Sequence, residues 1–203
     1  MQPNENRNIV WIASYPKSGN TWVRSILYCA THGKVELNQM GDLIPSFTNC
    51  VERFANERGL SEIDNAAKLW GDTQQWISSL GGFRVIKTHN ICGRIVGIPH
   101  PDPKLTHAAI CVVRDPRDVA VSYANHYGRT LDQAVKLLQM EDNFTFQPEN
   151  PFRKSLIGSW QTHFTSWLDA SFPVLAVRYE DLIAAPEQEI TRILEFLNLK
   201  PAI

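Results

Sequence analysis

A six-residue run near the start of the chain, Pro-Lys-Ser-Gly-Asn-Thr, collects groups that bind an anion. Lys17 supplies a positive charge, and the hydroxyls of Ser18 and Thr21 supply hydrogen-bond donors. Gly19 lets the backbone approach a ligand closely, because it carries no side chain. Asn20 and Thr21 are expected at the start of a helix, where unpaired N–H groups and the helix dipole favour negative charge. Together these residues predict a cradle for a phosphate or sulfate group.

The cradle departs from the pattern of the common nucleoside-triphosphate loop, G-x-x-x-x-G-K-[ST]. In that pattern the Lys follows the second Gly, whereas Lys17 precedes the only Gly of this run. A plain nucleoside-triphosphate site is therefore disfavoured. The alternative is a polar connection between a strand and a helix with an ordinary cap. Pro16, Lys17 and two aromatic neighbours favour the anion site over that alternative.

A second group of reactive side chains lies in the segment Arg-Val-Ile-Lys-Thr-His, where Lys87 and His89 stand at the end of a predicted strand. Residues two apart in a strand point to the same side, so both would face the mouth of the sheet. A histidine there can act as a general base beside an ammonium group that stabilises negative charge. The alternative is a histidine that caps a loop. No histidines pair at metal-ligand spacing, and we predict no metal site.

A third group follows the apolar run Cys-Val-Val, where Arg114 and Asp115 precede a proline. Proline at a first helical position, with Asp115 just before it, is a strong signal for a helix start. Arg114 can hold a phosphate with its fork of donors, and Ser122, about two turns along, can add a hydroxyl. We interpret Arg117 and Asp118 as surface charges of that helix.

These groups are expected on an alternation of strands and helices. Apolar, β-branched runs predict strands at residues 9–14, 83–87, 108–113 and 174–177. Helical spacing predicts helices at residues 21–30, 65–80, 116–127, 131–140, 152–170 and 186–198. This order predicts an α/β fold of three layers, a mostly parallel sheet with helices on both faces and ligands at the carboxyl ends of the strands. Residues 38–60 and 91–106 are predicted to be longer loops.

Length and composition narrow the class of protein. With 203 residues and a formal charge of −1, the chain suits one domain over residues 1–203 and gives no sign of a nucleic-acid partner. The first residues lack the apolar core of a signal peptide, and no apolar run is long enough to span a bilayer. We therefore predict a cytoplasmic protein. The four scattered cysteines predict reduced thiols rather than a disulfide framework.

Several segments together resemble the cytosolic-type sulfotransferase family. "SYPKSGNTW" resembles its 5′-phosphosulfate loop, "KTH" its catalytic-histidine segment and "VVRDPRDVAVSY" its 3′-phosphate segment. "GSWQTHFTSWLDA" and "VLAVRYEDL" also resemble that family, and the segments occur in its order over nearly the whole chain. The resemblance implies a P-loop NTPase-like fold. It also implies transfer of a sulfuryl group from 3′-phosphoadenosine 5′-phosphosulfate (PAPS) to a hydroxyl or amine of a small-molecule acceptor, without a metal, leaving 3′-phosphoadenosine 5′-phosphate (PAP).

The resemblance also implies roles for individual residues. Lys17 would contact the 5′-phosphosulfate and its bridging oxygen. His89 would take the proton of the acceptor, and Lys87 would help to stabilise charge during transfer. The residues implied in nucleotide binding are Ser18, Gly19, Asn20 and Thr21 around the 5′-phosphate, Trp22 and Tyr179 beside the adenine, and Arg114 and Ser122 at the 3′-phosphate. Asn20 replaces a Thr that is common in the family, and an amide donor can substitute for the hydroxyl.

One feature of the family has no counterpart in the sequence. Its C-terminal segment ends in an Arg-Lys-Gly loop over the 3′-phosphate and carries a dimer motif, whereas this sequence ends at Ile203. We therefore expect either an open nucleotide pocket with weaker donor affinity or a longer working protein. Two alternatives to an active sulfotransferase follow: a PAPS- or PAP-binding protein with little turnover and, less favoured, a P-loop kinase of small molecules. The sequence assigns neither the acceptor nor the oligomeric state.

Overall fold

A computed structural model describes residues 7–33, 44–60 and 66–199. Its centre is a sheet of four parallel strands in the order β2-β1-β5-β8. These strands span Ile9–Ser14 (β1), Arg84–Thr88 (β2), Thr106–Val113 (β5) and Val174–Arg178 (β8). All four predicted strands are thereby confirmed, with bounds shifted by two residues at most.

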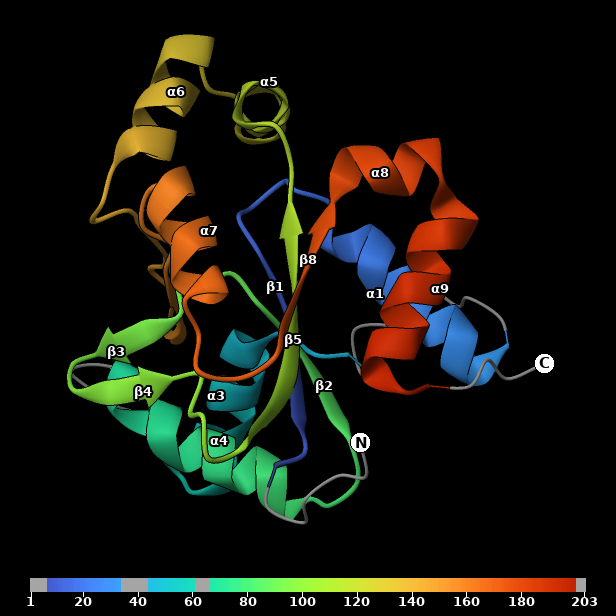
Figure 1. The fold of residues 1–203 in the computed structure, drawn as a ribbon. Helices are drawn as coiled ribbons and strands as arrows, with labels where there is room; N and C mark the ends of the chain where they lie inside the picture. Colours follow the sequence, from blue (N-terminus) through green and yellow to red (C-terminus); the bar gives the residue numbers. More distant parts are fainter. Residues whose placement is uncertain (1–6, 34–43, 61–65, 200–203) are drawn as a thin grey trace.

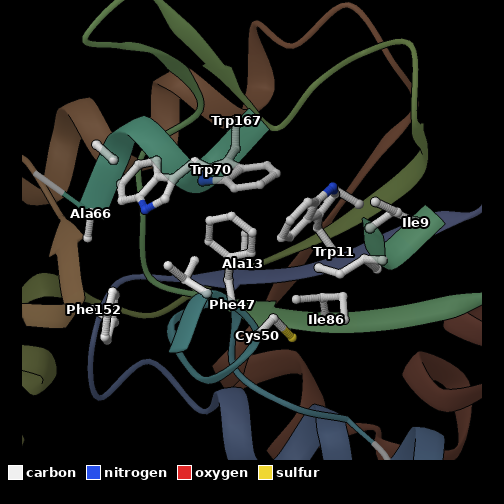
Figure 2. Packing of buried hydrophobic residues seen from close by; sticks show 14 of the residues in the cluster. Ile9, Trp11, Ala13, Phe47, Cys50, Ala66, Trp70, Ile86, Phe152 and Trp167 are labelled. Atoms are coloured by element: carbon white, nitrogen blue, oxygen red, sulfur yellow. The ribbon is translucent and has the colours of Figure 1, made fainter. Parts of the chain in front are cut away.

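The central strand β1 is buried on both faces, as its unbroken apolar run requires. Alternate side chains point to opposite faces, so Trp11 and Ile12 belong to two different core clusters. Figure 2 shows the cluster around Trp11, whose ring packs edge-on against Phe47 with centroids 5.4 Å apart. Phe47 in turn contacts Trp70 at 5.7 Å. These contacts anchor the helices of one layer to the sheet.

Helices cover both faces of the sheet, and the predicted three-layer fold is confirmed (Figure 1). One face carries α1, α8 and α9, which span Asn20–His32, Tyr179–Ala184 and Pro186–Leu197. The other carries α3, α4 and α7, which span Phe47–Glu57, Trp70–Ser79 and Trp160–Leu168, with a 3₁₀ turn at Ala66–Leu69 before α4. Within the described residues, no helix is long and apolar enough to cross a membrane.

Two further helices, α5 (Pro116–Tyr127) and α6 (Leu131–Gln139), lie beyond the carboxyl ends of the strands (Figure 1). Asp115 caps α5 by accepting from the N–H of Arg117, as the Asp-Pro signal predicts. Tyr15, which follows β1, packs into the small core of α5 and α6. The end of β1 and the start of α5 therefore border the same space.

Two predicted loops contain regular structure. Within residues 38–60, Ser46 caps α3 by accepting from the N–H of Asn49 at 3.3 Å, and the apolar face of α3 packs on the sheet. Residues 38–43 of that prediction lie outside the described residues. Within 91–106, strands β3 (Gly93–Ile95) and β4 (Ile98–His100) form a hairpin. Both loop predictions were wrong. The buried residues of α3 recur at helical spacing, so a local pattern was present there and was overlooked: Phe47, Cys50, Val51, Phe54 and Ala55. The hairpin depends on the pairing of β3 with β4, two strands too short to carry a long periodic pattern.

The predicted helix over 152–170 was wrong in its first part. Residues Asn150–Leu156 form strand β7, which pairs antiparallel with β6 (Phe144–Gln147). The helix α7 begins only at Trp160, where Ser159 accepts from the N–H of Thr162. Pairing with β6 decides this segment, and the partner strand cannot be identified from the local pattern alone. The other predicted helices are confirmed, with shifted ends; residue 65, predicted as a helix start, lies outside the described residues.

Candidate active site

The predicted cradle is the connection between β1 and α1. The N–H of Ser18 donates to the carbonyl of Tyr15 at 3.2 Å, which closes a tight turn. Lys17 and Gly19 both have positive φ, at 70° and 101°. Gly19 stands at the N-cap of α1 and no side chain caps the helix. The N–H of Trp22 donates to the Gly19 carbonyl at 3.0 Å, so the N–H groups of Asn20 and Thr21 are those of the first turn that remain for an anion.

Tyr179, at the start of α8, packs directly over this turn. A Cβ on Gly19 would lie 2.5 Å from Cδ2 of Tyr179, so only glycine fits there. The guanidinium of Arg114 stands 4.4 Å from the centroid of the same ring, and Trp22 meets it edge-on with centroids 5.7 Å apart. Arg114 also donates to the carbonyl of Lys17 at 3.2 Å. Residues predicted from three distant segments are thus brought into contact.

A cavity of about 460 Å³, which we call the cradle cavity, opens over the turn. Most of the predicted site residues line it: Lys17, Gly19, Asn20, Thr21, Lys87, His89, Arg114, Ser122 and Tyr179. Ser18 and Trp22 are not among its described lining residues. Ser18 is buried beneath the turn, and Trp22 is about one-third exposed beside Tyr179. The fold therefore gathers the other predicted residues around the cradle cavity, while Ser18 is buried next to it and Trp22 lies beside Tyr179.

Several polar atoms at the cradle are buried and have no hydrogen-bond partner among the described residues. They include the Ser18 hydroxyl, Oδ1 of Asn20 and Nε of Arg114. Nδ2 of Asn20 instead donates to the Ile12 carbonyl and to the Ser14 hydroxyl, each at 3.1 Å. The amide donor that was expected to replace a hydroxyl at the anion is therefore used on β1. Asn20 has its backbone N–H left for the anion.

His89 follows β2 and is held by the end of β1. Its Nδ1 lies 2.6 Å from the carbonyl oxygen of Ser14. A carbonyl can only accept, so Nδ1 carries the proton and Nε2 keeps a free lone pair. Burial lowers the pKa of His89 well below its usual value, and the nearby Lys87, His163 and Arg24 lower it further, against the hydrogen bond to Ser14. His89 is therefore a neutral imidazole near pH 7, as a general base must be.

Lys87 stands on β2, on the same side as His89. Burial, and to a lesser degree the charge of Arg24, lowers the pKa of Lys87 to about 8. Arg24 lies one turn into α1, lines the cradle cavity and donates to the Ile44 carbonyl at 2.6 Å. Arg24 was not among the predicted site residues, although its position four residues after Asn20 places it on the cradle side of the helix. Four cations line the cavity: Lys17, Arg24, Lys87 and Arg114.

A second cavity, also about 460 Å³, meets the cradle cavity at the catalytic candidates. It is bounded by the start of α3 and by the β6–β7 hairpin. Four residues line both cavities: Pro16, Lys87, His89 and Tyr127. Tyr127, at the end of α5, was not predicted as a site residue, because nothing in its local pattern distinguishes it from other helix-end residues.

The residue after His89 ties this segment to its surroundings. Asn90 is fully buried, and its Oδ1 accepts from the N–H of Leu156 at 2.8 Å while Nδ2 lies 3.2 Å from Nε2 of His100. Its carbonyl accepts from Nε1 of Trp167 at 3.0 Å, and its N–H donates to the Thr88 hydroxyl at 3.0 Å. All the polar groups of Asn90 are thus used, which fixes the backbone beside His89.

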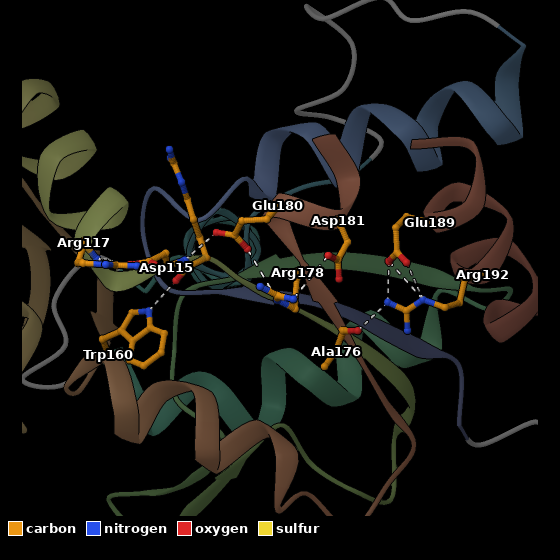
Figure 3. A network of polar contacts seen from close by, with 10 residues as sticks. Asp115, Arg117, Trp160, Ala176, Arg178, Glu180, Asp181, Glu189 and Arg192 are labelled. Atoms are coloured by element: carbon orange, nitrogen blue, oxygen red, sulfur yellow. Dashed lines mark hydrogen bonds and ion pairs between the residues drawn. The ribbon is translucent and has the colours of Figure 1, made fainter. Parts of the chain in front are cut away.

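Charges predicted to be ordinary surface groups form a network at the strand ends (Figure 3). Arg117 pairs with Asp115 at 2.5 Å and is 89% exposed, so it lies outside the site as predicted. The N–H of Asp115 donates to Glu180 at 2.9 Å, and Nε1 of Trp160 donates to the Arg114 carbonyl at 3.2 Å. These contacts join the ends of β5 and β8 and hold the backbone of Arg114 in place.

Comparison with known proteins agrees with this geometry. The family model described as the sulfotransferase domain matches residues 7–202. The chain belongs to the sulfotransferase family. The resemblance carried by the five motif segments is thereby confirmed.

Two sulfotransferases illustrate the relationship. The chain is 26% identical over 208 residues to Sulfotransferase 1E1 of Cavia porcellus, covering 94% of this chain and 59% of that protein. It is 28% identical over 199 residues to the luciferin sulfotransferase of Photinus pyralis, covering 93% of this chain and 50% of that protein. The chain thus spans less than two thirds of the length of these relatives.

A solved structure shares the fold. The crystal structure of retinol dehydratase in complex with androsterone and the inactive cofactor PAP superimposes with a TM-score of 0.58. It is 18% identical in sequence, with 96% of this chain and 60% of that chain covered. This likeness supports the three-layer architecture of the sulfotransferase domain.

Proposed function

We propose that this chain transfers a sulfuryl group from PAPS to a hydroxyl or amine of a small-molecule acceptor. The observation that supports this function best is the position of Lys87 and His89 on the wall between two cavities. One cavity contains the anion cradle, and the other is open to a second reactant. A base and a cation at the junction are what a transfer between two bound molecules requires.

The residues of the cradle cavity fit the donor. Lys17 and the open N–H groups of α1 would hold the 5′-phosphosulfate. Arg114, whose buried Nε has no described partner, would hold the 3′-phosphate with Ser122. Tyr179 and Trp22 offer aromatic surface to the adenine. PAPS supplies the activated sulfuryl group when it is bound. The solved structure of retinol dehydratase contains PAP, which is consistent with a nucleotide of this kind in the cradle cavity.

His89 would act as the general base. Its Nε2 accepts the proton of the acceptor hydroxyl, and the Ser14 carbonyl stabilises the resulting imidazolium through Nδ1–H. In the same step the acceptor oxygen forms a bond to sulfur, and the bond between sulfur and the 5′-phosphate oxygen breaks. Lys17 and Lys87 stabilise the negative charge that develops on the leaving phosphate.

Calorimetry in EDTA tests the donor site. We expect PAP to bind more tightly than AMP or ATP, and we expect Lys17→Ala and Arg114→Ala to weaken PAP binding at least about tenfold, because each removes a charge-assisted contact. Arg117→Ala is the matched control, since this exposed arginine pairs with Asp115, is not a described lining residue of the cradle cavity and should leave PAP binding unchanged. Metal-dependent binding of ATP in preference to PAP would refute the proposal and favour a kinase.

Turnover with PAPS tests the chemistry. His89→Gln should abolish sulfuryl transfer and leave PAP binding nearly intact, because the amide cannot take a proton. PAP binding without turnover by the unchanged chain would indicate a binding protein rather than an enzyme. Turnover that survives His89→Gln would exclude His89 as the base.

A further inference from the structure

The second cavity is lined mostly by polar side chains, unlike an apolar pocket. Three of its described residues are carbon-rich, Pro16, Phe47 and Tyr127, and Phe47 is only 1% exposed because its ring packs into the core. The other lining residues are polar, even when the reactive pair Lys87 and His89 is left out. It includes Thr48, Asn49, Thr145, Gln147, Arg153 and Ser155.

Arg153 is held in a defined orientation in this wall. Its Nε donates to Oε2 of Glu52 at 2.9 Å, and its Nη1 lies 3.4 Å from Oε1 of Gln147. Oε1 of Glu52 accepts from Asn150 at 2.7 Å, so the carboxylate is fixed from both sides. The structure describes no partner for Nη2 of Arg153 among the residues it covers. A rigid donor is thus available to a molecule in the cavity.

The charge of Arg153 is balanced by Glu52, so this end of the cavity carries polar groups with little net charge. An apolar acceptor would remove water from these groups without replacing its hydrogen bonds, which disfavours binding. A molecule with several hydroxyls replaces them, because each hydroxyl both donates and accepts. A strongly anionic acceptor gains little from an arginine that is already paired.

We propose that the acceptor is a neutral polyhydroxylated molecule of the saccharide class, held by Arg153, Gln147 and the hydroxyls of the second cavity. This inference rests on the proposed sulfuryl transfer. One hydroxyl of the saccharide lies at His89 Nε2, and its oxygen accepts the sulfuryl group as its proton passes to His89. The remaining hydroxyls bind along the β6–β7 hairpin.

The test compares two kinds of acceptor with PAPS as donor. Methyl β-glucoside and trehalose represent saccharides, and androsterone and 1-naphthol represent apolar hydroxyl compounds. PAP release is measured for each, saccharide binding to the PAP-bound chain is measured by saturation-transfer NMR, and PAP binding is measured separately by calorimetry. We expect kcat/KM for the better saccharide to exceed that for either apolar compound by at least about tenfold.

Variants locate the effect in the second cavity. Arg153→Met should lower kcat/KM for the saccharide about tenfold while PAP binding is unchanged, because a donor of the acceptor site is lost. Gln147→Leu tests the same wall independently should Arg153→Met fold poorly. Arg53→Met is the matched control: Arg53 also pairs with a glutamate, Glu57 at 2.9 Å, but is not a described lining residue of the cavity.

The outcomes separate the two proposals. Retained PAP binding with faster turnover of androsterone or naphthol overturns the saccharide inference and leaves the sulfotransferase proposal intact. If an apolar compound reacts while neither saccharide binds or reacts, the saccharide inference is also overturned and the sulfotransferase proposal stands. Equal effects of Arg153→Met and Arg53→Met also overturn the inference. Failure to bind PAP, with no turnover of any acceptor, refutes the proposed function and the inference with it.

Discussion

The contact between Gly19 and Tyr179 predicts a large effect from the smallest possible substitution. In Gly19→Ala the new Cβ would lie 2.5 Å from Cδ2 and 2.9 Å from Cε2 of Tyr179, and the backbone has φ of 101°. A side chain at positive φ costs about 1–2 kcal/mol. Displacing the ring weakens its contacts with Arg114 and Trp22, which together contribute about 1–3 kcal/mol. We therefore expect a loss of about 2–5 kcal/mol in the free energy of unfolding.

Chemical denaturation and calorimetry with PAP measure the two consequences. Gly81→Ala is the control, because Gly81 has φ of 69° and a Cβ there would meet nothing within 4 Å. We expect Gly81→Ala to cost only about 1 kcal/mol and to leave PAP binding unchanged. Gly19→Ala should lower PAP affinity at least about tenfold, because Tyr179 lines the cradle cavity. Equal losses of stability for the two variants, with unchanged PAP affinity in both, would refute the reasoning.

Two further predictions follow from the groups around His89. Above about pH 7, where the phosphates of PAP are ionised, PAP affinity should fall as the pH rises through 8 and then by up to about tenfold per pH unit, because Lys87, with a pKa of about 8, must be protonated to bind an anion. Calorimetry across pH 6–10 measures this, and a decline that persists in Lys87→Met would contradict it. Asn90→Ala should lower the free energy of unfolding by about 1–3 kcal/mol in urea denaturation, because it leaves the N–H of Leu156 unpaired and removes one of two contacts of His100 Nε2, which keeps the Thr88 hydroxyl at 3.3 Å. A loss below about 1 kcal/mol would show that Asn90 does not fix the segment.

The sequence predicted an element correctly where residues close together in the chain are themselves the physical cause of that element. The strands of the central sheet are short apolar runs, of which β1 is buried on both faces, and the cap of α5 is formed by the Asp-Pro pair that predicts it. The cradle was predictable for the same reason. Lys17 and Gly19 lie in one turn of consecutive residues, so the shape of that turn depends on order along the chain.

The tertiary structure decided what depends on partners far apart in sequence. The β6–β7 hairpin, Arg24 and Tyr127 contribute to the two cavities, and their local patterns resemble those of ordinary surface elements. Asn20 is another example: its position in the turn was predictable, but only the structure shows that its side chain donates to β1 rather than to the cradle. The sequence by itself determined the family, the four strands of the central sheet and most of the turn between β1 and α1. Only the packing of β1, β2, α5 and the hairpin determined which residues surround His89, because that depends on contacts between distant segments.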